Sequence, residues 1–267
     1  MDDLPLLEEL DQLILMHRNA HFAGSWAEML RYYEAEGIGC ADEIPFHRIE
    51  ELAIIERDLG QDLTPLVCSV EQQEEIQAAL TAYAQFRKLY EIDEPEARRP
   101  QLLANLLLAE ENELESAKEL VLQEGSSMVP ILIDILHRTE WLNPLYPGYG
   151  AAPARAAECL GELKDQRAVV ALFELLVQLG FQPETDFDIE ASVLEALHQI
   201  GTPAQEFLTR IIARRPIGPD HLPAMVALCR FGPTQPLRTT VAALQAELSP
   251  SSPLAQYCSI FLEEPNR

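Results

Sequence analysis

The chain of 267 residues carries 44 acidic and 19 basic side chains, which gives a formal net charge of -25 at pH 7. Such a negative field repels phosphate groups, so the composition argues against a nucleic-acid binder and against a protein that adheres to anionic membranes. The acidity is uneven, because residues 1–100 hold 22 acidic and 8 basic groups whereas residues 151–267 hold 14 and 9.

The amino terminus, Met1-Asp2-Asp3-Leu4-Pro5, has neither the positive charge nor the long apolar core of a signal peptide. No stretch approaches the roughly 18 consecutive apolar residues of a membrane-spanning helix. The 5 cysteines are far apart and form no Cys-x-x-Cys pair, which argues against a disulfide framework or a zinc site. We therefore expect a cytoplasmic protein that uses no metal or other cofactor.

The N-terminal region predicts helices almost throughout, without a recognisable repeat. Apolar residues at helical spacing indicate helices over 4–18, 26–33 and 46–59, and Ser25 is placed to cap the second. The longest clean pattern runs over 70–90 and is followed by a break at Asp93-Glu94-Pro95. A further helical block covers 96–123, where Pro100 would bend it. We take residues 1–95 as an irregular, acidic N-terminal helical region.

Three segments in the second half of the chain are versions of one another. Aligned on Leu160, Leu197 and Leu228, they lie 37 and 31 residues apart, and each is followed by an apolar stretch with helical spacing. A period in this range is typical of a solenoid of stacked helix pairs. Two of the turns inside the pairs, Gly201-Thr202-Pro203 and Gly232-Pro233-Thr234, combine a glycine that ends one helix with a proline that is tolerated where the next begins.

The predicted helix pairs cover 101–123 with 128–137, 153–161 with 166–179, 189–200 with 203–214, and 220–231 with 235–248. A last helix covers 253–263. We therefore predict an all-α protein in which residues 96–267 form an α-solenoid, with ordinary helix packing in a globular bundle as the alternative. The longer links, over 139–152, 180–188 and 216–219, should lie together on one edge of the stack.

The segment Pro153 to Leu176 resembles a HEAT repeat of the type first recognised in phycobilisome lyases. The resemblance extends to the copies around Leu197 and Leu228 and implies a right-handed stack of HEAT-like helix pairs, whose concave face is lined by the second helices and usually holds another protein. HEAT-like repeats also build the deoxyhypusine hydroxylase family, whose di-iron site relies on His-Glu pairs. This chain contains no His-Glu pair, so the resemblance does not imply that activity.

Two surfaces are candidates for binding a partner. Arg210, Arg214 and Arg238 lie on second helices, and stacking would align them in a basic strip that suits an acidic peptide or helix, unless they pair internally. The second candidate is the uncharged loop over 141–150, which either folds back over the solenoid or presents an apolar contact patch. Its aromatic residues are Trp141, Tyr146 and Tyr149.

Signals for catalysis are weak. His17 and His21 have the spacing of paired metal ligands on a helix, but no glutamate follows the first, and we interpret them as structural. The leading hypothesis is a non-enzymatic scaffold or adaptor, without catalytic residues, that binds another protein on the concave face or the long loops. The alternative is a lyase-type or metal-dependent enzyme or chaperone with a small-molecule cleft between the N-terminal region and the solenoid. A deep pocket lined by His17, His21 and Trp26 would favour it.

Overall fold

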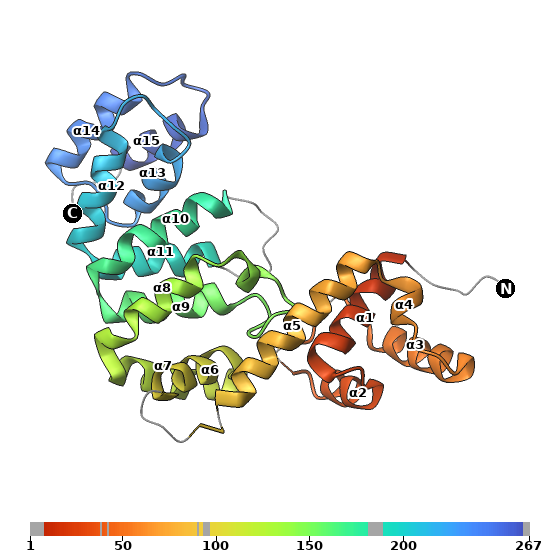
Figure 1. Cartoon of the computed structure of the whole chain (residues 1–267). Coiled ribbons are helices and arrows are strands. Elements are labelled where there is room, and N and C mark those ends of the chain that lie inside the picture. Colours follow the sequence, from red (N-terminus) through yellow and green to blue (C-terminus); the bar gives the residue numbers. More distant parts are fainter. Residues whose placement is uncertain are drawn as a thin grey trace. The chain divides into compact units, whose positions relative to one another are not determined.

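The computed structural model describes residues 8–37, 39–41, 43–89, 91–92, 97–180 and 189–263. These residues form α-helices and short 3-10 turns without a strand, so the prediction of an all-α protein is confirmed (Figure 1). Contacts divide the chain into two compact units. Unit 1 comprises Met1–Ala117 and Glu140–Gly150, and unit 2 comprises Lys118–Thr139 and Ala151–Arg267. None of the helices in the described ranges combines the length and the apolar character needed to cross a bilayer.

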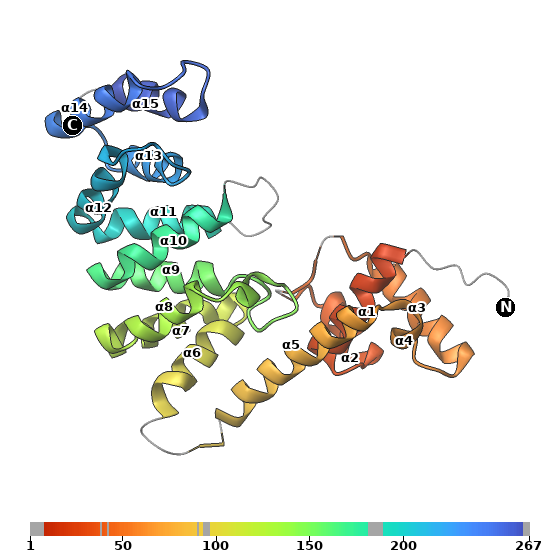
Figure 2. The same cartoon turned by 45° about the horizontal axis from the view of Figure 1, so that its top comes forward.

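Unit 1 is organised around its first helix. Its helices are α1 (Glu8–Phe22), α2 (Trp26–Glu34), α3 (Phe46–Leu59), α4 (Thr64–Val67), α5 (Val70–Leu89), α6 (Arg98–Leu108) and the start of α7 (Glu111–Glu124). Helix α1 contacts α2, α4 and α5, as can be followed in Figure 2. Ile14 and Leu15 of α1 are fully buried in a core that also contains Ile49 and Leu52 of α3. The predicted cap of α2 is present, because the Ser25 hydroxyl accepts a hydrogen bond from the amide of Glu28.

The segment after α5 differs from the predicted single block over 96–123. Ala109 has an extended backbone with ψ 131°, so the block is divided into α6 and α7 at this point. Pro100 lies in the first turn of α6, where the missing N–H has no intrahelical partner to lose. The short helix α4 was not predicted, since four residues are too few for a periodic pattern to indicate a helix.

Unit 2 contains helices that pack in two rows. They are α8 (Val129–Leu136), α9 (Ala152–Leu163), α10 (Val169–Leu179), α11 (Ile189–Ile200), α12 (Thr202–Ala213), α13 (His221–Cys229), α14 (Gln235–Gln245) and α15 (Pro253–Glu263). Helices two places apart in the chain contact each other, so that α8, α10, α12 and α14 follow one another in one row. The other row consists of α9, α11, α13 and α15, and both rows can be traced in Figures 1 and 2.

The repeated leucines and turns have the positions that the sequence predicts for them. Leu160, Leu197 and Leu228 are all 0% exposed. Gly201 and Gly232 have positive φ angles of 81° and 74° where α11 and α13 give way to the following helices. In the first copy Lys164 adopts the left-handed conformation, with φ 52°, although a side chain there is less favourable than glycine.

Helices α9 and α11 approach closely at Gly161. A Cβ atom on this residue would lie 2.7 Å from the Cα of Ala196 and 2.7 Å from the Oε1 of Gln199. Glycine therefore stands inside α9 for a packing reason, despite its low helix propensity.

The predicted division into domains, residues 1–95 and 96–267, remains a prediction. By contacts, α6 and the first half of α7 belong to unit 1, and so does Glu140–Gly150, which lies between α8 and α9 in the sequence. The predicted clustering of the long links remains a prediction too, because 181–188 lie outside the described residues.

Replacing Gly161 by alanine tests the close approach of α9 and α11. Alanine raises helix propensity by about 1 kcal/mol, but its methyl group would overlap Ala196, so we expect a net loss of about 1–3 kcal/mol in the free energy of unfolding. Urea denaturation followed by circular dichroism measures the loss. Glu162→Ala, at the exposed neighbouring position, is the control and should change stability by less than about 0.5 kcal/mol. An unchanged or increased stability of Gly161→Ala would contradict the packing described here.

Candidate functional site

An open groove lies between α12 and α14 in unit 2. Its volume is about 370 Å³. Its lining residues are Gln205, Glu206, Thr209, Arg210, Thr234, Pro236, Leu237 and Thr240. Because α12 and α14 are the second helices of two successive predicted pairs, the groove is formed by the helices that are expected to line the binding face.

The guanidinium of Arg210 lines this groove and is available to bind a ligand. Its side chain is exposed and makes no hydrogen bond or ion pair with any residue of the described ranges. Glu206, one helical turn earlier, is also exposed and does not pair with it. A guanidinium group carries five N–H donors in a planar fork, so Arg210 can receive a carboxylate without breaking an internal bond.

The other two arginines of the predicted strip have internal partners. Arg214, at the end of α12, forms an ion pair with Asp220. Arg238 of α14 donates a hydrogen bond of 2.7 Å to the main-chain carbonyl of Leu262. The strip is therefore reduced to Arg210 as the arginine that is both in the groove and available.

The aromatic loop over 141–150 packs against residues of the N-terminal region within unit 1, which differs from the predicted fold-back over the solenoid. Trp141 is 7% exposed, and its ring lies 5.8 Å from that of Phe86 and 6.2 Å from that of Tyr146. Leu145 belongs to the same core as Ile14. The aromatic surfaces of Trp141, Tyr146 and Tyr149 are thus used inside the protein, and none of the three side chains is exposed.

The two histidines of α1 lie in a cluster with tyrosines, which we call the histidine–tyrosine cluster: His17, His21, Tyr83 and Tyr149. The imidazole centroids of His17 and His21 are 4.4 Å apart, and the ring of Tyr149 lies 4.6 Å from that of His21. His21 donates through Nε2 to the carbonyl of Pro144 at 3.1 Å and accepts through Nδ1 from the Tyr83 hydroxyl at 2.7 Å. Both ring nitrogens of His21 are therefore occupied.

The cluster is tightly closed around Gly39. His17 donates through Nε2 to the Gly39 carbonyl at 3.1 Å, and the Gly39 amide donates to the Tyr32 hydroxyl at 2.9 Å. A Cβ atom at Gly39 would lie 2.3 Å from the ring of Tyr149, so only glycine fits there. The backbone at Gly39 thus fills the space next to the imidazoles.

Burial keeps both histidines of the cluster uncharged at neutral pH. It lowers the pKa of His17 to about 4, against the opposing effect of the hydrogen bond to Gly39. Burial and the neighbouring His17 lower the pKa of His21 to about 3. Burial likewise raises the pKa of Tyr83 above its ordinary value. A general base needs a lone pair that a substrate proton can reach, and both ring nitrogens of His21 are already bonded while His17 is buried in the same packed cluster.

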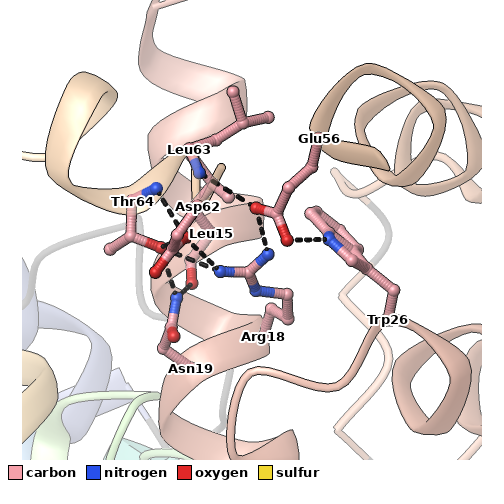
Figure 3. A network of polar contacts seen from close by, with 8 residues as sticks. All are labelled: Leu15, Arg18, Asn19, Trp26, Glu56, Asp62, Leu63 and Thr64. Atoms are coloured by element: carbon pink, nitrogen blue, oxygen red, sulfur yellow. Dashed lines mark hydrogen bonds and ion pairs between the residues drawn. The ribbon is translucent and has the colours of Figure 1, made fainter. Parts of the chain in front are cut away.

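A buried ion-pair network surrounds Arg18 (Figure 3). The guanidinium donates to Glu56 at 2.6 Å, to Asp62 at 2.8 Å and to the Thr64 hydroxyl at 2.9 Å. It also lies 4.5 Å from the centre of the Trp26 ring, and the Trp26 indole donates to the second oxygen of Glu56 at 2.8 Å. Trp26 therefore belongs to this network, which joins α1, α2, α3 and α4, rather than to the histidine–tyrosine cluster.

The cysteines have the environment of core residues. Burial raises the pKa of Cys68 and that of Cys258 to about 11, and it also raises the pKa of Cys40. No disulfide joins any of the five. A metal site is not apparent either, because the described part of the chain holds no group of three or more His, Cys, Asp or Glu side chains placed around one ion.

Sequence reasoning found Arg210 in the groove but missed the polar residues around it. Gln205 and Thr209 are four residues apart on α12, as are Pro236 and Thr240 on α14, so the spacing places each pair on one helix face. The spacing does not predict that these faces of α12 and α14 lie side by side and line one groove.

Comparison of the chain with protein-family models, with curated proteins and with solved structures finds no match.

Removing the Arg18 guanidinium should destabilise unit 1. Glu56, whose side chain is 18% exposed, would then lie in a largely dry environment without its cation. We expect Arg18→Met to lower the free energy of unfolding by about 3–5 kcal/mol, as measured by urea denaturation. Arg57→Met, which removes an exposed ion pair with Asp58, is the control and should cost less than about 1 kcal/mol. If adding Glu56→Gln to Arg18→Met recovers no stability, the uncompensated charge is not the cause.

The buried histidines should make the protein less stable in acid. The pKa of His17 falls from 6.5 to about 4 on folding, so between these pH values the unfolded chain binds a proton that the folded chain does not. Stability is therefore complete above the unfolded pKa and decreases as the pH falls, by about 2 kcal/mol for this residue between pH 7 and 5.

The variant His17→Gln keeps an N–H donor for Gly39 but cannot be protonated, so it should lose about 2 kcal/mol less over the same interval. Urea denaturation at both pH values measures the difference, and His47→Gln, at an exposed position of α3, is the control. Equal pH dependence of the wild type and His17→Gln would contradict a buried, neutral His17.

Proposed function

We propose that this protein is a non-enzymatic scaffold or adaptor in which unit 2 forms a HEAT-like α-solenoid and binds a partner protein on the face of its second helices. Two features support the solenoid. The leucine-and-turn unit recurs at Leu160, Leu197 and Leu228, and helices two places apart pack in two rows. One helix pair cannot bury its apolar stripe alone, so an array of this kind is stabilised by contacts between neighbouring pairs.

The observation that carries the proposed binding role is the available guanidinium of Arg210 in the groove between α12 and α14. Arg214 pairs with Asp220, Arg215 with Glu247, and Arg238 with the Leu262 carbonyl, whereas the exposed Arg230, just after α13, does not line the groove. The groove is open to solvent, which suits a polypeptide that lies along it, whereas small-molecule sites usually enclose most of their ligand.

The proposed partner is an acidic segment of another protein. A carboxylate can form two parallel hydrogen bonds with the guanidinium of Arg210. The net charge of -25 repels acidic partners at long range, but this repulsion is screened beyond about 8 Å at physiological ionic strength. Recognition would therefore depend on close contact in the groove, by complementarity of shape and charge and without a cofactor, rather than on electrostatic steering.

The cytoplasm is the proposed location. No disulfide joins the five cysteines, which fits a reducing compartment. An intracellular scaffold would meet its partner there.

Reversing the charge of Arg210 tests the proposal. Proteins that co-purify with the wild-type chain would be displayed as arrays of short overlapping peptides, and the bound peptides would be titrated by fluorescence anisotropy. Arg210→Glu should weaken binding of the acidic peptides roughly 10- to 100-fold, because a hydrogen bond to a charged group contributes about 1.5–3 kcal/mol.

The matched control is Arg230→Glu, which makes the same change of charge at an exposed residue just after α13 that does not line the groove. This variant should bind almost as the wild type does. Unchanged binding by Arg210→Glu, or equal weakening by both variants, would show that the groove is not the binding site.

A further inference from the structure

We infer, resting on the proposed function, that the groove between α12 and α14 takes an extended polypeptide segment with a single carboxylate rather than an amphipathic helix. The hydrogen-bond acceptors of the groove determine whether an extended or a helical segment binds. The charges beside them determine how many carboxylates the segment carries.

Two threonine hydroxyls of the groove are restricted to accepting hydrogen bonds. The Thr209 hydroxyl donates its proton to the Gln205 carbonyl at 2.7 Å, and the Thr240 hydroxyl donates to the Pro236 carbonyl at 3.2 Å. A hydroxyl has one proton and two lone pairs, so each of these oxygens retains capacity as an acceptor only. The carboxylate of Glu206 adds a third acceptor to the groove.

An extended segment supplies the donors that these acceptors need. Each residue of an extended chain other than proline has a main-chain N–H that is not used within the segment. In a helix, the same groups are bonded to carbonyls of the preceding turn, and only those of the first turn remain. The acceptors on Thr209, Thr240 and Glu206 therefore match an extended backbone.

The apolar lining does not provide the surface that a helix would need. An amphipathic helix binds by laying an apolar stripe into an apolar groove. The apolar side chains of this groove are Pro236 and Leu237, and Leu237 is only 3% exposed. A helical partner would cover the threonine and glutamate acceptors without offering them main-chain donors, which weakens its binding relative to an extended segment.

The charges of the groove limit the partner to one acidic side chain at this point. Arg210 and Glu206 are four residues apart on α12, which separates them by about 6 Å along the helix axis. In an extended segment, side chains two residues apart share a face and lie about 7 Å apart. A second carboxylate two residues from the one bound to Arg210, on the side toward Glu206, would therefore lie near Glu206, where like charges repel. The groove thus favours an acidic residue flanked by uncharged ones over a run of acidic residues.

Three matched libraries of short peptides with a central glutamate test this inference on the full chain. The first has a free backbone and random uncharged flanks, the second is N-methylated at the residues beside the glutamate, and the third is stapled as a helix. Binding is measured by fluorescence anisotropy. The free-backbone library should bind about tenfold more tightly than the other two, because N-methylation and helix formation remove the N–H donors.

The double variant Thr209→Val/Thr240→Val removes the two acceptors while keeping the side-chain shapes. It should weaken the free-backbone library about tenfold and leave the N-methylated library unaffected. The control is Thr239→Val, at an exposed position of α14 that does not line the groove.

The outcomes separate this inference from the proposed function. Binding that depends on Arg210 but favours the stapled library, or that ignores the threonine substitutions, would overturn the extended form and leave the scaffold role intact. Tighter binding of peptides with several adjacent glutamates would overturn the single-carboxylate preference. If no library binds in a manner that depends on Arg210, both the inference and the proposed function are wrong.

Discussion

The burial of the Arg18 guanidinium is the interaction on which the arrangement of α1 to α4 depends. Arg18 is 2% exposed, and removing such a charge from water costs several kcal/mol unless its donors are satisfied. The two terminal nitrogens of the guanidinium donate to Glu56 of α3, Asp62 in the turn that follows and Thr64 of α4, while its Nε has no hydrogen-bond partner among the described residues. The carboxylate of Glu56 also accepts a hydrogen bond from the Leu63 amide at 2.9 Å. The turn between α3 and α4 is therefore bonded to Glu56, and through Asp62 it also contacts the Arg18 guanidinium. A second buried pair, Arg48 with Asp11, joins α1 to α3 in the same way.

Unit 2 is held together mainly by apolar faces and by small residues that let helices approach. Helix α9 buries alanines on much of its surface, and Gly161 brings its backbone next to that of α11. Contacts repeat from one helix to the helix two places later, and α12 and α14 carry polar residues along the groove between them. The groove is therefore a consequence of how the helices pack, and its chemistry depends on the few side chains that the packing does not use.

The histidine–tyrosine cluster is not the best candidate for a site. It brings together imidazoles and phenols, but His21 bonds to Tyr83 and to the Pro144 carbonyl, and His17 bonds to the Gly39 carbonyl. The groove has few functional groups, yet Arg210 is accessible and has no hydrogen bond or ion pair with another described residue that a ligand would have to break. Binding requires groups that exchange water for a ligand at low cost, so availability is the more useful guide to function in this protein.

Much of the secondary structure could be predicted from the sequence, because each signal depends on residues that are close together in the chain. These signals are the helical spacing of apolar residues, the cap at Ser25 and the turn glycines Gly201 and Gly232. The burial of Leu160, Leu197 and Leu228 followed from the same local pattern. Only the tertiary structure decided that the loop with Trp141 packs in unit 1. It also decided that Arg214 pairs with Asp220 and that Arg238 donates to the Leu262 carbonyl. Finally, it placed Thr209 and Thr240 in one groove with Arg210. The packing of the loop, the partner of Arg238 and the groove all depend on contacts between residues that are distant along the chain. The pairing of Arg214 depends on how the turn after α12 folds. A single sequence shows which side chains are present, but the packing of helices determines which of them remain available.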